Sequence, residues 1–150
     1  MFIKKIVLNF IIISFFICNS YSEEIQIESE NINVKDDGNL IYAKNSNIFI
    51  PSKKIRIYSD KAEYNKKKNI IIFTDKVFFE DLKKNITLKG QKVTYEKNKE
   101  LIYTDGETNI NFEEKYNVKS KNIFFNRNLN IVYGDNEALI VDFDQNFYIL

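Results

Sequence analysis

Residues Ile55 to Asp75 read IRIYSDKAEYNKKKNIIIFTD, and this stretch decides the fold. Apolar and polar residues alternate through Ile55 and Ile57 and again through Ala62 and Tyr64. A period of two residues is typical of β-strands with one buried face and one solvated face. A tract of lysines and asparagines follows and predicts a hairpin turn, after which a third strand begins.

The same pattern recurs along the chain with a period of about 30 residues. Its best copy has Ile57, Ser59, Ala62, Tyr64, Ile70, Phe73, Thr74 and Asp75. The next copies have Leu88, Gly90, Val93, Tyr95, Leu101, Tyr103, Thr104 and Asp105, and then Val118, Ser120, Ile123, Phe125, Ile131, Tyr133, Gly134 and Asp135. Aligning the first of these with the best copy requires one residue of slippage before Phe73. A degenerate first copy has Ile27, Ser29, Ile32, Val34, Leu40, Tyr42 and Ala43. One such unit cannot bury its own apolar face, so we expect about four copies stacked into one all-β domain.

The copies predict short antiparallel strands of five to seven residues. In the first copy these strands lie near 24–28, 31–34, 40–43 and 47–50. Hairpin turns are predicted near Asp37-Gly38, Lys66–Lys68 and Lys97–Lys99, and at Glu113-Glu114-Lys115, because polar tracts there separate the alternating runs. Apolar residues do not recur at helical spacing after residue 24, so we predict an almost purely antiparallel β protein.

The first 22 residues have the pattern of a secretory signal. Lys4 and Lys5 precede the apolar run Ile6 to Ile17, and Ser20-Tyr21-Ser22 is a small-x-small cleavage motif. The apolar run has 12 residues, whereas a membrane-spanning helix needs about 20. We therefore expect cleavage after Ser22 and export of a single domain at 23–150, with a retained anchor as the less favoured alternative.

Composition excludes several classes of function. Removing Lys4 and Lys5 from the 22 basic residues leaves 20 against 21 acidic ones, so the mature net charge is −1. A nucleic-acid partner is not expected, because that footprint is a basic excess on one face. The chain has no histidine, and its single cysteine lies within the signal. We predict no disulfide, no metal, no cofactor and no enzymatic activity.

Paired carboxylates remain as candidates for cation binding, at Asp36/Asp37, Glu113/Glu114 and Asp142/Asp144. Acidic pairs are ordinary in turns and on solvated strand faces, so we interpret all three as structural. The run Lys66–Lys68 has the charge to meet phosphate, but we interpret it as a solvated hairpin tip.

The apolar stripe is the candidate functional surface. Its members are Ile57, Ala62, Tyr64, Val77, Phe79, Leu88, Val93, Tyr95, Ile110, Phe112, Val118, Ile123 and Phe125. Two interpretations fit this pattern. The residues either pack together as the core of a closed sandwich or line an apolar trough between two incompletely closed faces.

The repeated phrase is [I/L/V]-x-[S/G]-x-x-[A/V/I]-x-[Y/F], followed by a Lys/Asn tip and an apolar strand. It resembles the OstA-like family of lipopolysaccharide transport, which comprises LptA, the periplasmic part of LptC and the N-terminal domain of LptD. Ser59-Asp60-Lys61-Ala62-Glu63-Tyr64-Asn65 is the part most similar to the family's recurrent phrase. The strand exit departs from the family, because Thr74-Asp75-Lys76-Val77 replaces its frequent Gly-Asn-Val.

This resemblance implies a twisted, V-shaped β-jellyroll in the periplasm whose apolar interior holds the acyl chains of lipopolysaccharide. It further implies edge-to-edge stacking with other OstA-like domains on a path to the outer membrane. The apolar ending at Phe147 to Leu150 leads us to expect a truncated, N-terminal LptD-type fragment, with an outer-membrane barrel in the same or a partner chain.

Two alternatives stay open. Outer-membrane barrels also alternate apolar and polar residues, but their strands need about 9–11 residues, more than the runs predicted above. A secreted β-solenoid with a structural or adhesive role has a similar repeat length, and its closed core would not accept an acyl chain.

Overall fold

The computed structural model describes residues 24–112, 115–134, 139–142 and 147–149, and for the last two segments it describes the backbone alone. The predicted signal peptide with its cleavage site at Ser22 lies outside these residues, as do Glu113, Glu114 and Asp144. Within the described part, eleven strands form one antiparallel sheet. They are β1 (Gln26–Lys35), β2 (Leu40–Ile50), β3 (Ile55–Asn65), β4 (Ile70–Asp81), β5 (Ile86–Glu96), β6 (Leu101–Phe112), β7 (Tyr116–Lys121), β8 (Ile123–Asn126), β9 (Ile131–Gly134), β10 (Leu139–Asp142) and β11 (Phe147–Ile149).

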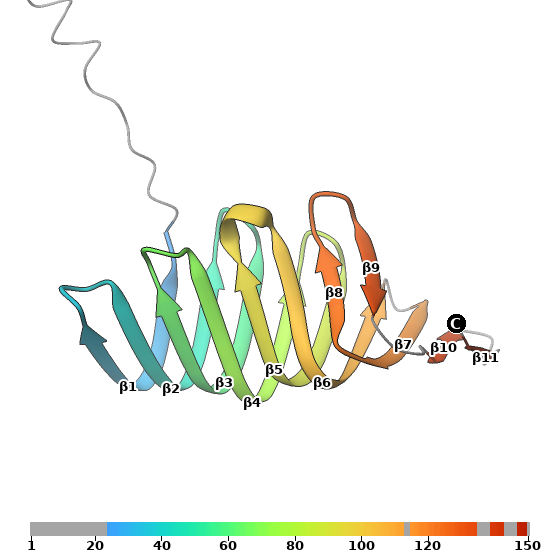
Figure 1. The fold of residues 1–150 in the computed structure, drawn as a ribbon, viewed down its shortest axis with the longest axis horizontal. Helices are drawn as coiled ribbons and strands as arrows, with labels where there is room; N and C mark the ends of the chain where they lie inside the picture. Colours follow the sequence, from blue (N-terminus) through green and yellow to red (C-terminus); the bar gives the residue numbers. More distant parts are fainter. Residues whose placement is uncertain (1–23, 113–114, 135–138, 143–146, 150) are drawn as a thin grey trace, which may run out of the picture.

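The strands follow one another in sequence order from β1 to β7, and β10 and β11 continue the sheet beyond β7. β8 pairs instead with β6 on one side and β9 on the other. A 3-10 helix, η1 (Lys97–Lys99), links β5 to β6, and the described residues contain no α-helix. Figure 1 shows the resulting row of hairpins. The prediction of an antiparallel, all-β repeat fold is confirmed.

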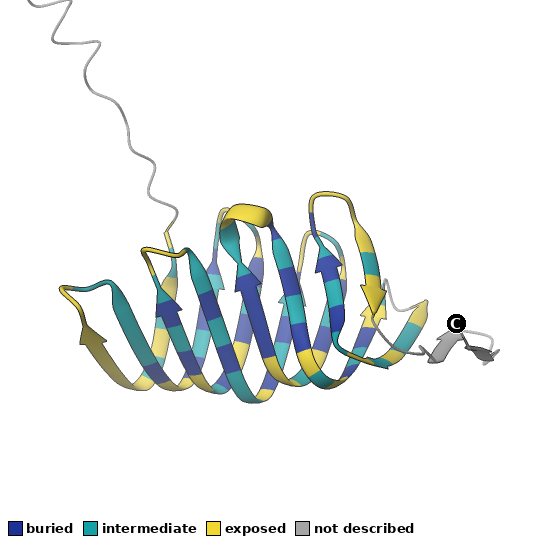
Figure 2. Ribbon diagram, in the orientation of Figure 1, coloured by how far each residue is buried: buried dark blue, intermediate teal, exposed yellow. Residues whose placement is uncertain are grey.

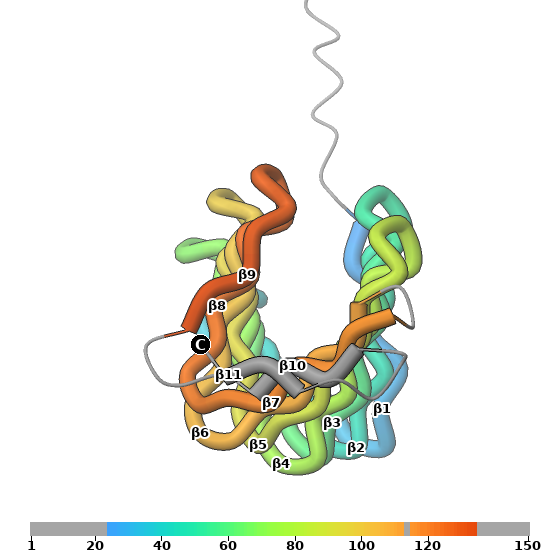
Figure 3. Tube along the Cα trace, turned by 90° about the vertical axis from the view of Figure 1, so that its right-hand side faces the viewer, coloured from blue at the N-terminus to red at the C-terminus, as the bar shows by residue number. Residues whose placement is uncertain are grey.

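Each long strand bends sharply near its middle, so that the sheet folds into two walls joined along a vertex (Figure 3). The register shifts between Tyr58 and Lys61, between Thr74 and Val77, and between Gly90 and Lys92. Such irregularities bend a strand and increase its local twist. Gly106 sits at the same level with φ of 91°, a conformation that a residue without Cβ adopts at little cost. The V shape therefore follows from local backbone features at each vertex.

Strand length was predicted incorrectly. β2, β3 and β5 have 11 residues each, and β4 and β6 have 12. The predicted pairs of short strands, such as 40–43 and 47–50, are the two halves of one bent strand. The polar interruption between the halves is the vertex, which breaks the alternation of side chains without ending the strand.

The turns fall into two rows along the tops of the walls. We call the turns at 36–39, 66–69, 97–100 and 127–130 the first rim, and those at 51–54 and 82–85 the second rim. Backbone hydrogen bonds link successive turns, for example from Lys97 N to Asn69 O at 2.9 Å on the first rim. The predicted hairpin tips near residues 37, 66–68 and 97–99 are confirmed, and their spacing along the first rim is the 30-residue repeat.

Buried apolar residues of both walls form a continuous core. Ile50, Ile55, Ile71 and Phe73 are among its fully buried members. Figure 2 shows where buried residues occur along the strands. None of the described residues forms a helix with the length and apolar character needed to cross a membrane. The turns join neighbouring strands and do not hold the two walls together by themselves. The stability of the domain therefore depends on packing of the core between the walls.

Candidate functional site

Strand register gathers one set of predicted lining residues on the inner face of the second wall. Ile57 lies opposite Phe79, and Phe79 lies opposite Leu88. The row continues from Leu88 through Ile110 to Val118. Directly paired residues in antiparallel strands project from the same face. Five predicted residues from five strands therefore form one apolar row.

A second row crosses the inner face of the first wall. Tyr64, Ile71, Tyr95, Ile102 and Phe125 are paired in that order from β3 to β8. The remaining predicted residues add to these rows, with Ala62, Val93 and Ile123 on the first wall and Val77 and Phe112 on the second. Every predicted lining residue thus belongs to the inner faces, although Ile71 and Ile102 were not predicted.

The space between the walls is filled by these side chains. Ile57, Phe79, Val93, Tyr95 and Ile110 are 0% exposed. Phe112 and Val118, towards the C-terminal end, are half-buried. At the other end, Ile32 and Val34 of β1 continue the first-wall inner face and are 48% and 55% exposed. The walls must therefore separate before an acyl chain can lie between them.

One feature of the predicted repeat is wrong. Tyr103 was aligned with Phe73 because each is an aromatic residue followed by Thr and then Asp. Register instead pairs Phe73 with Val93 and Val93 with Thr104, which places Thr104 on the inner face. Tyr103 lies on the outer face, where its ring stacks on Phe124 at 6.0 Å between centroids. Strand register, and not similarity of residues, decides which face a side chain occupies.

Four charged residues meet between the two rims, and we call them the mouth cluster: Lys53 from the second rim, Asp81 from the end of β4 next to that rim, and Glu100 and Arg127 from the first rim. Arg127 Nε donates to Asp81 Oδ2 at 2.7 Å, and Arg127 Nη1 donates to Glu100 Oε2. Arg127 Nη2 also donates to the backbone carbonyl of Lys53 at 3.2 Å. The cluster therefore bridges the mouth of the V.

The mouth cluster is buried as well as paired. The side chains of Asp81 and Arg127 are 0% and 5% exposed. Lys53 Nζ lies 2.8 Å from Glu100 Oε1, which also accepts a hydrogen bond from the Tyr95 hydroxyl at 3.0 Å. Burial alone would raise the pKa of Glu100, but the hydrogen bond from Lys53 and the charge of Arg127 outweigh it and lower this pKa. Burial likewise opposes the charge of Arg127, whose pKa is nevertheless raised by Asp81.

Sequence reasoning missed the mouth cluster, although part of its signal was present. Asp81 is in phase with Val77 and Phe79, and Arg127 is in phase with Ile123 and Phe125. A charge in phase with a buried face indicates either a strand end or a buried partner. Glu100 and Lys53 carry no such signal, because they lie in turns.

The other candidates lie on solvated surfaces where the structure describes them. Asp36 pairs with Lys67 at 2.8 Å between two turns of the first rim. Asp142 is described by its backbone alone. The described residues include no cluster of three or more acidic, histidine or cysteine side chains suited to a metal.

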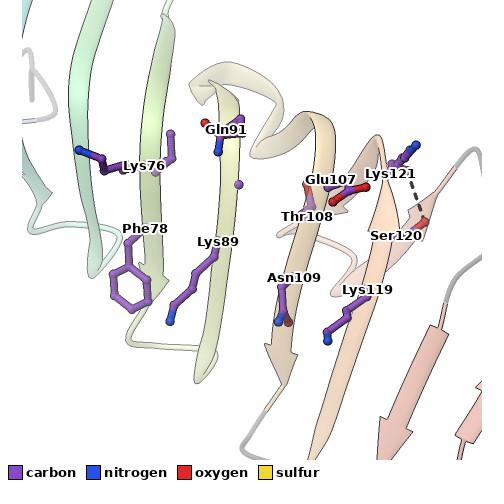
Figure 4. Close-up of a pocket in the computed structure, with 12 residues that line it drawn as sticks. Lys76, Phe78, Lys89, Gln91, Glu107, Thr108, Asn109, Lys119, Ser120 and Lys121 are labelled. Carbon is purple, nitrogen blue, oxygen red and sulfur yellow. Dashed lines mark hydrogen bonds between the residues drawn. The ribbon is translucent and has the colours of Figure 1, made fainter.

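A hollow lies mainly on the outer face, and Val77 is the one predicted trough residue among those that line it. Phe78, Lys89, Asn109 and Lys119 line it and are paired across four strands (Figure 4). They alternate with the inward residues Phe79, Leu88, Ile110 and Val118 on the same strands. This hollow is therefore mainly on the opposite side of the second wall from the predicted trough.

Comparison with known proteins places this arrangement in a family. The family described as "Lipopolysaccharide-assembly, LptC-related" matches residues 20–132. The chain belongs to this family. The same fold occurs in the crystal structure of LptH, described as the LptA homologous periplasmic component of the lipopolysaccharide transport device from Pseudomonas aeruginosa. The two align with a TM-score of 0.68 at 9% identity, over 85% of this chain and 94% of that one.

A search of curated protein sequences gives no match. Membership of the LptC-related family confirms the resemblance to OstA-like proteins of lipopolysaccharide transport, and the likeness to LptH confirms the jellyroll fold. The more specific interpretation, an N-terminal LptD-type fragment, stays a prediction.

Proposed function

We propose that this LptC-related chain is a non-catalytic periplasmic bridge domain that shields lipopolysaccharide acyl chains between its two walls on the way to the outer membrane. The observation that carries this proposal is the pair of unbroken apolar rows running across successive strands. Exposed acyl chains cost about 25 cal/mol per Å² of apolar surface in water, and an apolar trough removes that cost without chemistry. Family membership favours this function over a secreted solenoid or a piece of a barrel.

Because the interior is packed, an acyl chain can enter only by displacing contacts between side chains. An acyl chain takes the place of contacts that the walls make with each other, so apolar surface stays buried throughout. The predicted lining residues then change partners from side chain to lipid. Such exchange needs little net hydrophobic free energy, which suits a carrier that must also release its cargo.

We propose that transport partners stack on the edge strand β1. Among the described strands β1 pairs with β2 alone, and its other edge can accept a strand from another OstA-like domain. Ile32 and Val34 would then continue the apolar row into the neighbour, which removes their exposed surface from water.

Cleavage after Ser22 would deliver the domain to the periplasm, and the mass of the exported protein tests this.

Consecutive phenylalanines on β4 give a matched test of the trough. Phe79 lies in the inner row, and Phe78 lies on the outer face beside Tyr58 at 6.3 Å between ring centroids. A photo-crosslinking phenylalanine derivative at position 79 should capture lipopolysaccharide, whereas the same derivative at position 78 should not. Tyr64 and the outward Glu63 provide a second pair on the first wall.

Thr94 is a poorer outer control than Glu63, because its side chain is on the outer face but only 3% exposed. Replacement of Tyr95 by aspartate should reduce capture at position 79, with circular dichroism confirming that the variant folds. Equal capture from both faces, or none in a folded protein, would show that the walls form a closed structural sandwich.

A further inference from the structure

The chain is nearly neutral, with a net charge of +1, yet its positive charge gathers on the rims. Both described turns of the second rim contain two lysines in succession, Lys53-Lys54 and Lys83-Lys84. The first rim contains three consecutive lysines, Lys66–Lys68, followed one repeat later by Lys97 and Lys99. Turns of this kind need polar residues, but they do not require that the polar residues be cationic.

Lysines at the vertex, in contrast to some of those on the rims, are paired with carboxylates. Lys61 pairs with Asp75 at 2.9 Å, and Lys92 pairs with Asp105 at 3.0 Å. Lysines and carboxylates therefore balance one another at the vertex. On the first rim, Lys66 and Lys68 are exposed and form no ion pair with another residue of the described chain. The rims thus hold positive charge that internal pairing does not use.

The mouth is where an amphiphile with chains between the walls must place its head group. Continuous backbone closes the interior at the vertex, which lies opposite the mouth. The interior therefore meets solvent between the two rims, along its length. A head group there would lie between the lysines of both rims. It would also lie over the mouth cluster, because Arg127 and Asp81 come from opposite rims.

Separation of the walls breaks the contact between Arg127 and Asp81. An arginine left buried without a partner is strongly unfavourable. A phosphate removes that cost, because its oxygens accept the same forked pair of N–H bonds as a carboxylate. Lys84 Nζ, which donates to Asn130 Oδ1 across the mouth at 3.2 Å, would be released at the same step.

From these observations we propose that the lysine-rich rims and the mouth cluster form a binding site for the phosphate groups of an amphiphile, and that phosphate replaces Asp81 on Arg127 as the mouth opens. The proposal rests on the proposed function, since it assumes that acyl chains enter between the walls. It adds the head-group chemistry that the site selects. It also assigns a role to Lys66–Lys68, which the sequence pattern alone left as a solvated tip.

The test uses the mature chain with the photo-crosslinker at position 79 and two probes. One probe is lipid A carrying two phosphates, and the other is the same lipid after enzymatic removal of both phosphates. We expect half-maximal capture of the phosphorylated probe at about tenfold lower concentration, the size expected from one or two charge-assisted hydrogen bonds. Inorganic phosphate added with the dephosphorylated probe shows whether a free anion suffices, because it would then restore part of the capture.

Three variants test which residues cause the preference for the phosphorylated probe. A triple variant, Arg127→Met with Asp81→Asn and Glu100→Gln, removes the three most buried charges together and leaves Lys53, whose side chain is 35% exposed, as the remaining charge of the cluster. Its preference for the phosphorylated probe should fall to about twofold, the share that the rim lysines provide. A second variant, Lys66→Gln with Lys68→Gln, changes exposed residues only and should lower the preference about twofold, more at low salt. The matched control is Lys61→Gln with Asp75→Asn at the vertex, which should keep the full preference.

The outcomes separate the two proposals. Capture of neither probe from position 79 contradicts the proposed function and this inference together. Equal capture of both probes by the wild-type chain overturns the phosphate site and leaves the trough intact. A preference that keeps its full wild-type size in both the triple and the rim-lysine variants also overturns it. If the triple variant does not fold, the rim-lysine variant still decides.

Discussion

The vertex and the mouth both hold the two walls together, but they do so with different chemistry. At the vertex the backbone is continuous, and small hydroxyl side chains hydrogen-bond to nearby groups. The Ser46 and Ser59 hydroxyls lie 3.0 Å apart, and Ser59 also donates to the Lys61 carbonyl at 2.9 Å. At the mouth no backbone crosses among the described residues, and buried ions meet from turns that are far apart in the sequence.

This difference suggests which side of the V can open. The hydroxyl hydrogen bonds at the vertex are neutral, and the vertex ion pairs such as Lys61–Asp75 join neighbouring strands. Moving the walls as bodies therefore need not break these contacts. The Arg127–Asp81 contact joins residues 46 apart in the chain and exists only while the rims are close. A buried ion pair contributes little net stability but is costly to leave half-made. The mouth is therefore suited to two states, open and closed, whereas the vertex is suited to one.

The largest expected effect comes from breaking the mouth cluster at one residue. Asp81→Ala leaves Arg127 with Glu100 as its remaining carboxylate in the mouth cluster and should lower the free energy of unfolding by about 3–5 kcal/mol. That is a large share of the roughly 5–15 kcal/mol available to a small domain. Urea denaturation should show a lower midpoint at an unchanged slope.

Two further variants isolate the ion pair from the turn. Asp81 Oδ1 accepts backbone hydrogen bonds from Lys83 and Lys84 at 3.1 and 3.0 Å. Asp81→Asn keeps those acceptors, so any loss it shows belongs to the pair with Arg127. Asp60→Ala is the exposed control, because its contact with Lys76 at 3.1 Å is solvated and should matter by about 0–1 kcal/mol. Wild-type stability in Asp81→Asn would mean that the mouth is not held by charge.

Acid should weaken the mouth as the Glu100 carboxylate becomes protonated. The pKa of Glu100 is lowered in the folded state, so its charge contributes stability at neutral pH. That contribution is complete above the ordinary carboxyl value of 4.5 and is lost as the pH falls through the lower folded value. Lys53, Arg127 and the Tyr95 hydroxyl face this carboxylate, and Asp81 shares Arg127 with it.

Glu100→Gln isolates this contribution from that of the other acids. The difference in unfolding free energy between wild type and Glu100→Gln should be largest at pH 7 and should narrow below pH 4.5. It should stay smaller than the effect of Asp81→Ala, because glutamine still accepts hydrogen bonds. A difference that stays constant from pH 7 to pH 3 would contradict the assignment.

The contrast also explains what sequence could predict. The repeat, the turns and the inner rows follow from alternation, which is local, so residues such as Ile57 and Leu88 were placed on the correct face. Strand length was wrong because the vertex interrupts alternation within one strand. Tyr103 was misplaced because similar phrases were aligned without register. The mouth cluster depends on where two rims meet in space, and Glu100 and Lys53 had no periodic signal to reveal it.

The smallest expected effect comes from the hydroxyl pair at the vertex. Ser59→Ala removes its hydrogen bonds to Ser46 and to the Lys61 carbonyl, and a neutral hydrogen bond contributes about 0.5–1.5 kcal/mol. Ser46 keeps the Ser59 carbonyl as an acceptor at 3.4 Å, so the loss should lie near the lower end. A double-mutant cycle with Ser46→Ala should give a coupling energy of about 0.5 kcal/mol, since the two hydroxyls are in contact.

Lipid A capture at position 79 should be unchanged in all three variants, because the vertex stays closed while the mouth opens. A fall in capture that matched the loss of stability would show that the V opens by deforming along its whole length, and the separate roles of vertex and mouth would then be wrong.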